Sequence, residues 1–251
     1  RMAGDVPLLI PEVNADHVDL ISAQRRNRGW GGGALVTSPN CTATPVVMAL
    51  APLRPFGIRQ VSVVSMQAIS GAGYPGIASL DIFDNVVPYI SGEEEKVEAE
   101  SRKMLGAVNG DHVLPLNAVI SAQCNRVPVL DGHTVAVSVA LDERPSLDDI
   151  RRAWLAFRGN KLVASLPSAP ARPLIVHDAP DRPQPRRDRD AGQGMSAAVG
   201  RLRDCPVLGY KFVAMAHNTV RGAAGGAILN AELLIAAGYV EGVTFAEAAH
   251  V

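Results

Sequence analysis

Pro7-Leu8-Leu9-Ile10-Pro11 is a short apolar stretch bounded by prolines, and it begins the pattern that decides the fold class. Asn14-Ala15-Asp16-His17 is typical of a helix start. The side chains expected on the buried side of that helix are Val18, Leu20 and Ile21. Gly31-Gly32-Gly33 then interrupts the chain, and Ala34-Leu35-Val36-Thr37 is a candidate buried strand. This order of strand, helix and strand favours a parallel sheet, so we expect an α/β protein.

The rest of the chain adds further strands and helices to this start. Alternating or apolar stretches predict strands over residues 58–66, 118–122, 134–141 and 208–216. Helices are predicted over residues 93–105, from Ser146 onward and over 223–237. The apolar residues expected on their buried faces are Val97, Met104 and Leu105; Leu147, Ile150, Trp154 and Leu155; and Ile228, Leu229, Leu233 and Leu234.

The composition excludes several classes of protein. Of the 251 residues, 47% are hydrophobic and 20% are charged, so the chain can bury a core. A net charge of −1 excludes a nucleic-acid binder that relies on bulk positive charge, and 4% aromatic residues argue against a stacking surface for single strands. We expect no membrane span and no signal peptide, because neither type of apolar segment is present. Three cysteines are too few for a disulfide scaffold, so we expect free thiols, no metal site and a cytoplasmic protein.

Cys41 is the first candidate for chemistry. It follows the turn Ser38-Pro39-Asn40 and precedes the apolar run 46–53, which places it at the N-terminus of a helix. The partial positive charge and unpaired N–H groups there lower a thiol pKa and can hold the oxyanion of a tetrahedral adduct. The alternative is a small buried residue, which is a common environment for a free cysteine.

A nucleophilic cysteine needs a base, and His133 is the favoured one of the six histidines. It follows a turn in a segment that also carries Arg126. A guanidinium and an imidazole together suit a carboxylate-bearing substrate whose carbonyl is attacked by sulfur. Gln67, at the end of a predicted strand, offers an amide that could orient an acyl group. A surface or capping role for His133 and simple solvation of Gln67 are the alternatives.

Two weaker patterns accompany these residues. The loop Ser70-Gly71-Ala72-Gly73 allows a phosphate or a nicotinamide to approach closely, although it lacks the spacing of the dinucleotide fingerprint and is also compatible with a plain turn. Glu93 and Lys96 share one face of a predicted helix, which by itself indicates a solvated surface pair.

Three motifs together resemble the aspartate-semialdehyde dehydrogenase family. They are Ser38-Pro39-Asn40-Cys41-Thr42, the segment 67–73 and the segment 125–133. Their order and spacing are similar to those of the archaeal and fungal branch, from about residue 1 to about residue 237.

The resemblance implies a role for each matching position. Cys41 would be the nucleophile that forms a thioester, His133 the acid/base, and Gln67 the group that orients the intermediate. Arg126 would bind the substrate carboxylate, and Glu93 the substrate amine. The residues implied in phosphate binding are Lys96, Asn40 and Arg1. The residues implied in NADP binding are Ser70, Gly71, Ala72, Gly73 and Asn218.

The implied reaction is the NADP-dependent reductive dephosphorylation of β-aspartyl phosphate to aspartate semialdehyde, in the biosynthesis of lysine, threonine and methionine. The implied partners are this small substrate, phosphate, and further copies of the chain in a homodimer or homotetramer, with no nucleic acid and no membrane. The implied domains are a remnant of a Rossmann-like NADP-binding domain (1–40), an α+β catalytic and dimerisation domain with a mixed sheet (41–216), and a C-terminal helix that returns to the NADP-binding domain (217–251).

The sequence departs from the family at its start. The glycine-rich loop of the family's first βα turn is not present, so we expect a chain without most of the N-terminal cofactor domain, which binds NADPH poorly and turns over slowly. Two alternatives remain: a related acyl reductase such as malonyl-CoA reductase, and an inactive dimerising module. Residues 178–194, with three prolines and alternating charges, are expected to be a solvated loop or a subunit contact, and 241–251 an uninformative tail.

Overall fold

A six-stranded mixed sheet organises the computed structural model, which describes residues 1–240. The strand order is β4-β1-β5-β8-β7-β6, with parallel pairing of β1 with β4 and of β6 with β7, and antiparallel pairing elsewhere. A separate hairpin is formed by β2 and β3. The strands are β1 (Ile58–Gln67), β2 (Ala107–Asn109), β3 (His112–Leu114), β4 (Val119–Arg126), β5 (His133–Leu141), β6 (Leu174–His177), β7 (Ala197–Cys205) and β8 (Gly209–Ala216). The expected α/β fold with a mixed sheet is therefore confirmed.

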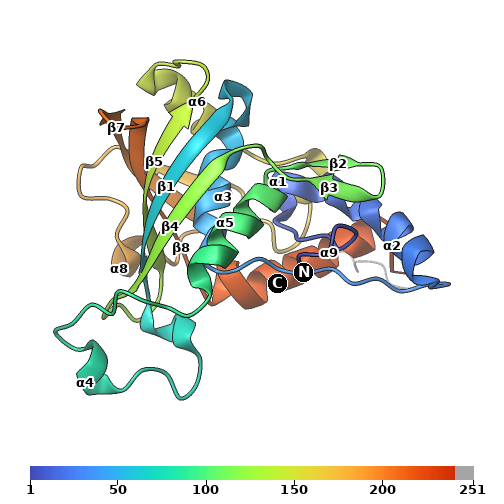
Figure 1. Cartoon of the computed structure of the whole chain (residues 1–251), viewed down its shortest axis with the longest axis horizontal. Coiled ribbons are helices and arrows are strands. Elements are labelled where there is room, and N and C mark those ends of the chain that lie inside the picture. Colours follow the sequence, from blue (N-terminus) through green and yellow to red (C-terminus); the bar gives the residue numbers. More distant parts are fainter. Residues whose placement is uncertain (241–251) are drawn as a thin grey trace, which may run out of the picture.

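Helices cover one face of this sheet (Figure 1). The helices are α1 (Pro11–Asn14), α2 (Leu20–Arg28), α3 (Ala43–Leu50), α4 (Ser79–Ile82), α5 (Glu93–Met104), α6 (Leu147–Ala156), α7 (Lys161–Ala164), α8 (Pro185–Asp188) and α9 (Gly225–Ala236). The central helix α3 is buried along its whole length, and α5 lies against β4. Helix α6 begins after Ser146, as expected, and its N-terminus has a capping box in which Ser146 and Asp149 exchange hydrogen bonds.

Alternation along the strands separates a buried face from an exposed one. In β1, Val61 and Val63 point into the core under α3 and α5, while Ser62 and Val64 are exposed on the opposite face. The edge strand β4 alternates in the same way. Because side chains of a strand point to opposite faces in turn, this pattern leaves one side of β1 and β4 open to solvent.

The N-terminal segment differs from its expectation. Residues 34–37 do not form a buried strand, because Leu35 is half-exposed and the only pairing is a single parallel bridge between Leu8 and Thr37. Two backbone hydrogen bonds form this bridge: the N–H of Leu9 donates to the carbonyl of Thr37 at 3.0 Å, and the N–H of Thr37 donates to the carbonyl of Pro7 at 2.9 Å. The expected order of strand, helix and strand is kept, but the two strands are reduced to this single bridge. The Gly31-Gly32-Gly33 segment is exposed, so too little apolar surface is available there to hold a longer strand.

A second, smaller core joins the two ends of the described chain. Val18 and Ile21 from the N-terminal helices pack with Leu229 and Leu233 of α9. Val18, Leu20 and Ile21 are all buried, as expected.

Two apolar positions expected on buried helix faces are instead exposed: Leu155 in α6 and Ile228 in α9. Each is next in sequence to a fully buried residue, Trp154 or Leu229, so both positions lie at the edge of the buried helix face.

The segment 178–194 is more ordered than a solvated loop. It contains α8, and the carboxylate of Asp188 is buried where it pairs with Arg182 and accepts from the backbone of Gln184. Gly132, just before β5, lies against Pro185. The segment thus supports the start of β5, while its role as a subunit contact stays a prediction. The predicted tail 241–251 lies outside the described residues, and so does the end of the predicted C-terminal segment 217–251. The helix predicted over 223–237 is α9. Among residues 1–240, no helix is both long enough and apolar enough to cross a membrane.

Candidate active site

Cys41 lies where the chain enters α3. Asn40 caps this helix, because its Oδ1 accepts from the backbone N–H groups of Thr42 (2.8 Å) and Ala43 (3.2 Å). The Cys41 Sγ is 3.3 Å from Nε2 of His133. The two residues are 92 positions apart in the chain, and the fold brings them into direct contact.

His133 is the first residue of β5 and is fully buried. Its Nδ1 accepts a hydrogen bond from the backbone N–H of Ala68 at 3.0 Å. Because a backbone N–H can only donate, Nδ1 carries no proton, and the neutral ring carries its proton on Nε2, which faces the sulfur. In this geometry the imidazole donates toward Cys41 and does not accept from it.

The surroundings hold both groups of this pair neutral. Burial raises the pKa of the Cys41 thiol to about 11, and the carboxylate of Glu93 acts in the same direction. Burial also lowers the pKa of His133 to about 3, assisted by the positive charge of Arg126. The expected lowering of the thiol pKa by the helix N-terminus is therefore wrong, because desolvation of the sulfur outweighs the effect of the helix end.

Glu93, at the start of α5, is the centre of a polar cluster beside the sulfur. Its two oxygens accept from Nδ2 of Asn40 at 2.9 and 2.8 Å. Gln67 Nε2 is 3.5 Å from Oε2, and Lys96 Nζ is 3.3 Å from Oε1. Glu93 and Lys96 are thus a pair at the site and not an isolated pair on the surface.

Glu100 was not identified from the sequence, and it extends this cluster along α5. Its Oε2 accepts from the backbone N–H of Asn40 at 2.6 Å, and its Oε1 is 2.8 Å from Nε of Arg1. Glu100 follows Glu93 by two helical turns, so the spacing on one helix face could have revealed it. The N-terminal segment that carries Arg1 is held by the ammonium of Lys103, which donates to the carbonyls of Arg1, Ala3 and Val6 at 2.8, 2.7 and 2.8 Å.

Arg126 ends β4 and is almost completely buried. Its Nη1 donates to the carbonyl of Ala68 at 2.8 Å. Ala68 is also the residue whose N–H donates to His133. The Arg126 main chain exchanges two hydrogen bonds with that of Val87, with N···O distances of 3.0 and 2.8 Å. The guanidinium borders a cavity of about 580 Å³ that is otherwise lined by residues 72–90.

Two glycines make close approaches that a side chain would prevent. A Cβ at Gly71 would lie 2.8 Å from Nη1 of Arg126 and 2.9 Å from Nε2 of His133, and a Cβ at Gly222 would lie 2.7 Å from Cβ of Cys41. Gly71 therefore keeps open the space beside the imidazole, and Gly222 allows the segment before α9 to pack on the nucleophile.

Asn218 connects the glycine loop to the histidine strand. Its Oδ1 accepts from the N–H of Gly132 at 2.8 Å, and its Nδ2 donates to Oγ of Ser70 at 2.8 Å. The neighbouring Arg221 forms a fully buried ion pair with Glu12, in which Nη1 and Oε1 are 2.9 Å apart. These contacts fix the C-terminal segment to the site from two sides.

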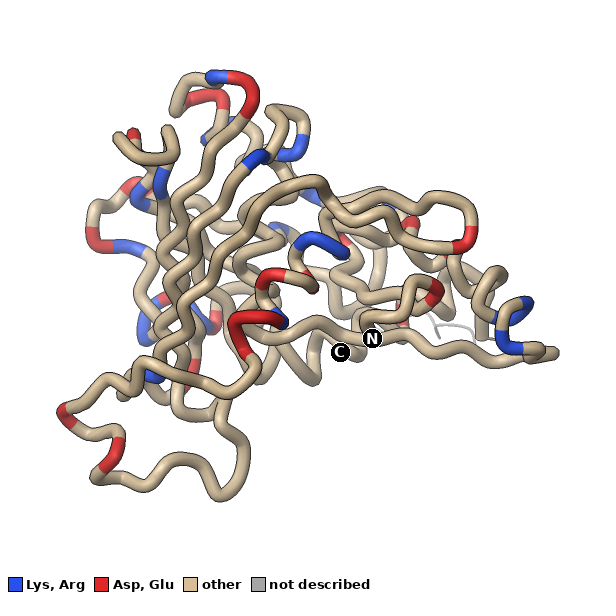
Figure 2. The backbone as a smooth tube through the Cα atoms, viewed as in Figure 1, with Lys and Arg blue, Asp and Glu red and all other residues tan. Residues whose placement is uncertain are grey.

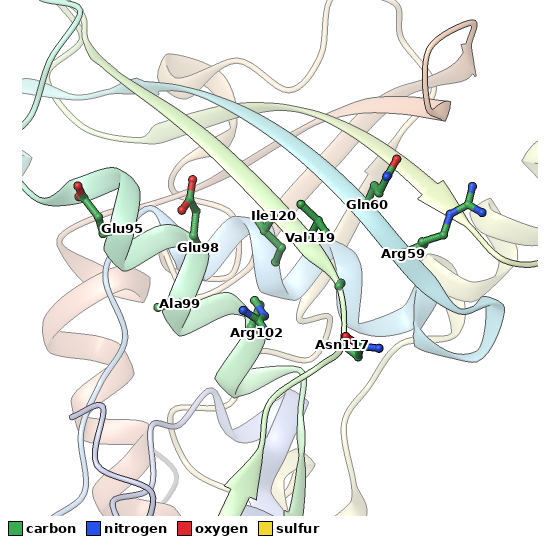
Figure 3. A pocket seen from close by; sticks show the side chains of 10 residues that line it. Arg59, Gln60, Glu95, Glu98, Ala99, Arg102, Asn117, Val119 and Ile120 are labelled. Carbon is green, nitrogen blue, oxygen red and sulfur yellow. The ribbon is translucent and has the colours of Figure 1, made fainter.

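Another cavity lies away from these residues, between α5 and the edge strand β4 (Figure 3). It measures about 680 Å³ and includes none of the predicted site residues. On this side of α5, Oε1 of Glu98 accepts from the backbone N–H of Ala122, and Oε1 of Glu94 from that of Cys124, each at 2.9 Å. The cavity is therefore a feature of the sheet edge and not of the site.

Comparison with known proteins identifies the family. The profile described as "Semialdehyde dehydrogenase, dimerisation domain" matches residues 50–221. An aspartate-semialdehyde dehydrogenase of Archaeoglobus fulgidus is 53% identical over 235 residues, which cover 94% of this chain and 67% of that protein. The chain belongs to the aspartate-semialdehyde dehydrogenase family.

Solved structures of aspartate-semialdehyde dehydrogenases agree with this assignment. The Candida albicans enzyme, solved with NADP, has a TM-score of 0.83 and 41% identity, covering 95% of this chain and 69% of that one. Aspartate-semialdehyde dehydrogenase II of Vibrio cholerae, complexed with ASA, has a TM-score of 0.71 and 25% identity, covering 92% and 68%. The archaeal and fungal relatives confirm the branch expected from the motifs.

Within this family assignment, the structure brings the predicted site residues together. Cys41 and His133 are in contact, Gly71 adjoins His133 and Arg126, and Asn40 links to Glu93. Arg1 joins the group through Glu100. The functional role of each residue stays a prediction. For His133 the observed hydrogen bonds fit a donor to the sulfur, whereas the resemblance implies an acid/base.

Proposed function

We propose that the chain catalyses the NADP-dependent conversion between β-aspartyl phosphate and aspartate semialdehyde, with the acyl group carried as a thioester on Cys41. The observation that carries the proposal is the 3.3 Å contact between the Cys41 sulfur and a histidine whose proton faces it. A thiol and an imidazole in contact at a helix start are the parts that acyl transfer through sulfur requires.

Arg126 and Glu93 supply the groups that recognise an amino acid. The guanidinium of Arg126 is buried beside His133 and borders a cavity, so it can pair with the carboxylate of the substrate. The Glu93 carboxylate is near enough to the sulfur to raise the pKa of Cys41, and it can bind the ammonium group. Since Glu93 raises the pKa of Cys41, neutralisation of its charge by the bound ammonium lowers that pKa, so substrate binding itself favours the thiolate.

Lys96, Asn40 and Arg1 are the proposed phosphate ligands. Lys96 is half-exposed and Arg1 is one-third exposed, so both can turn from their carboxylate partners toward a phosphate. Asn40 lies between them, next to the nucleophile. A lysine, an arginine and an amide suit the charge and the acceptor oxygens of a phosphate.

The loop Ser70-Gly71-Ala72-Gly73 fits the nicotinamide end of NADP. A Cβ at Gly71 would fill the space beside Nε2 of His133, so the glycine leaves room for a flat ring next to the sulfur. Asn218 holds Ser70 and Gly132 in place around that space. NADP, when bound, supplies the hydride or accepts it.

The chain's own residues account for the remaining steps. In the oxidative direction the Cys41 thiol loses its proton to solvent, and the sulfur adds to the aldehyde carbon while the carbonyl π electrons move to oxygen. The Nε2–H of His133 stabilises first the thiolate and then this oxygen as a hydrogen-bond donor. After the carbon has been oxidised to the thioester level, phosphate attacks the carbonyl, the C–S bond breaks, and the acyl phosphate and the Cys41 thiolate are released.

The same proposal includes a homodimer in a reducing compartment such as the cytoplasm. The matched family is described by its dimerisation domain, and the structure leaves Cys41, Cys124 and Cys205 as free thiols.

Trapping of the acyl group tests the function without NADP. The chain is incubated with β-aspartyl phosphate and digested, and the mass of the Cys41 peptide is measured. We expect an aspartyl adduct on Cys41 in the wild type and in Cys205→Ser, and none in Cys41→Ser. No adduct on Cys41 would refute the thioester proposal, and preferential acylation by malonyl-CoA would favour the related acyl reductase.

A further inference from the structure

Residues 220–224, here called the π turn, form one turn of π-helix between β8 and α9. Their hydrogen bonds reach back five residues. The N–H of Gly222 donates to the carbonyl of His217 at 3.0 Å, and the N–H of Ala224 donates to the carbonyl of Thr219 at 3.1 Å. Single turns of π-helix are rare in proteins and are frequent at functional sites, so we looked for the contacts that this one makes.

The π turn lies directly on the nucleophilic residue. A Cβ at Gly222 would lie 2.7 Å from Cβ and 2.9 Å from Cα of Cys41, so the main chain of the turn is in close contact with that residue. The chain just before the turn contacts the histidine side of the site. Ala216 pairs with His133 in the sheet, and Asn218 accepts from the N–H of Gly132. One short segment therefore contacts both members of the Cys41–His133 pair.

A buried ion pair anchors the π turn to the other end of the described chain. Arg221 and Glu12 expose 3% and 5% of their surface, and the two guanidinium nitrogens pair with the two carboxylate oxygens, with Nη1 and Oε1 2.9 Å apart. Glu12 is itself fixed, because Gly159 packs closely on its main chain and Arg54 donates to the carbonyl of Val13 at 3.1 Å. Two parallel hydrogen bonds define the position of the guanidinium as well as its charge.

No neighbouring charge can replace this anchor. From residue 212 to residue 240, Arg221 and Glu232 are the only Lys, Arg, Asp or Glu side chains. In Figure 2, α9 and the chain that leads into it are accordingly tan over almost their whole length. Glu232 serves another contact, since it accepts from the N–H and the hydroxyl of Ser168 at 2.9 and 2.6 Å. Among the charged groups of this stretch, the Arg221–Glu12 pair alone holds the π turn.

Stability is a weak explanation for such a pair. The desolvation of two buried charges consumes most of their attraction, so packed apolar side chains would hold the two ends of the chain together at least as well. A bidentate ion pair differs from apolar packing in fixing one position, and the position fixed here is that of the main chain on Cys41.

We propose that Arg221 and Glu12 are positioning residues, whose pair holds the π turn against Cys41 and thereby sets the distance from the Cys41 sulfur to His133. The effect on acyl transfer rests on the proposed function, whereas the effect on the sulfur does not.

The π turn acts on Cys41 by packing and by excluding water. The charged and titratable groups that act on the sulfur are Glu93, Arg126 and His133, and they come from α5, β4 and β5. Variants of the turn leave these groups unchanged. Because burial raises the pKa of the thiol, water admitted by a displaced turn lowers that pKa and makes the sulfur more reactive toward alkylation.

The first experiment compares the alkylation of Cys41 in Arg221→Lys and in the wild type. Lysine keeps the positive charge but cannot form the two parallel bonds to Glu12. The chain reacts with iodoacetamide at pH 8, and the labelled Cys41 and Cys124 peptides are measured by mass spectrometry. We expect Cys41 to react about 10-fold faster in the variant, since each unit of pKa changes the thiolate fraction tenfold. Cys124, which is fully buried in β4, should react as in the wild type.

The matched control is Glu232→Gln, which weakens another buried contact of α9 without touching the π turn. We expect both cysteines of the control to react like those of the wild type. A Cys41 rate in Arg221→Lys within about twofold of the wild type would overturn the proposal. It would equally be overturned if Cys124 rose by the same factor as Cys41, or if the control showed the same rise, because either result indicates general loosening.

The second experiment measures acylation of Cys41 over a series of β-aspartyl phosphate concentrations. We expect the limiting rate in Arg221→Lys to fall about 10-fold or more, because the sulfur is misplaced. The half-saturating concentration should stay within about twofold, since Arg126 and Glu93 are unchanged. An unchanged limiting rate would refute the positioning role in acyl transfer. If the wild type is not acylated, the proposed function fails, and the alkylation experiment still decides whether the π turn controls the sulfur.

The third experiment uses hydrogen exchange of the unmodified chain, so it does not depend on the folding of a variant. After correction for intrinsic rates, the amides of Gly222 and Ala224 should exchange as slowly as those of Leu229 and Leu233, because an anchored turn opens only together with the core. Exchange at least about 100-fold faster in the π turn would mean that it opens by itself and does not fix Cys41, which would overturn the proposal.

Discussion

The substitution Gly71→Ala tests the pairing of Cys41 with His133 by adding a single methyl group. The new Cβ would lie 2.9 Å from Nε2 of the imidazole and 2.8 Å from Cε1, whereas ordinary contacts begin at 3.4 Å. Relief of this contact takes a shift of about 0.5 Å in the ring or in the loop. The 3.3 Å contact between sulfur and Nε2 then lengthens or tilts, because the ring is enclosed on its other sides.

The expected loss follows from the strength of that contact. A hydrogen bond to a charged group contributes about 1.5–3 kcal/mol. If the shift removes about half of it, acylation of Cys41 slows roughly 4- to 13-fold. The backbone at Gly71 does not have a positive φ, so alanine is compatible with the local conformation and the fold should persist.

The assay is the initial rate of acylation of Cys41 by β-aspartyl phosphate, followed by mass spectrometry. The matched control is Gly31→Ala, at an exposed glycine that also lacks a positive φ and whose Cβ would meet nothing within 4 Å. We expect the control to react like the wild type. A Gly71→Ala protein that melts normally and is acylated within twofold of the wild-type rate would refute the role assigned to the histidine contact.

Three further predictions follow from burial. Because burial raises the pKa of Cys41 to about 11, its alkylation rate should increase about tenfold per pH unit from pH 7 toward that value, and a plateau near neutrality would contradict this environment. The pKa of His133 is about 3 in the folded chain and about 6.5 when unfolded, so its contribution to stability is complete above pH 6.5 and is lost as the pH falls toward 3. In wild type the unfolding free energy, measured with urea, should therefore fall with decreasing pH by up to about 1.4 kcal/mol per pH unit more than in His133→Asn. An equal pH dependence in the two proteins would show that the histidine is not the cause. Arg221→Met leaves the carboxylate of Glu12 buried without its partner and should cost about 3–5 kcal/mol in unfolding free energy, while the double variant with Glu12→Gln should recover part of this loss; equal losses in the two proteins would disprove the pairing.

The fold was predictable where the sequence alternates regularly. The strands β1 and β5 were expected within one residue of their observed bounds, since their valines recur at every second position. The strand β7 was missed because it is irregular: Arg201 has a positive φ, and the register shifts between Gly200 and Arg203. The opposite error occurred at residues 34–37, where apolar composition predicted a buried strand but no neighbouring strand covers them.

The site was predictable where a short motif carries it, and not where contact depends on distant parts of the chain. Cys41 and His133 belong to recognisable motifs, although only coordinates show that the sulfur is desolvated. Two contacts could not be predicted from the local sequence. They are the packing of Gly222 on Cys41 and the hydrogen bond from the Ala68 N–H to His133. Such contacts are set by tertiary structure, which composition and periodicity do not report.

The glutamates of α5 that accept from the outer backbone of β4 also limit how copies of the chain can join. Ala122 and Cys124 would otherwise offer N–H donors to a strand from another molecule, and Glu98 and Glu94 already occupy them. A strand of another molecule therefore finds no free N–H group at these two positions of β4, so the sheet does not continue from one copy to the next at this edge.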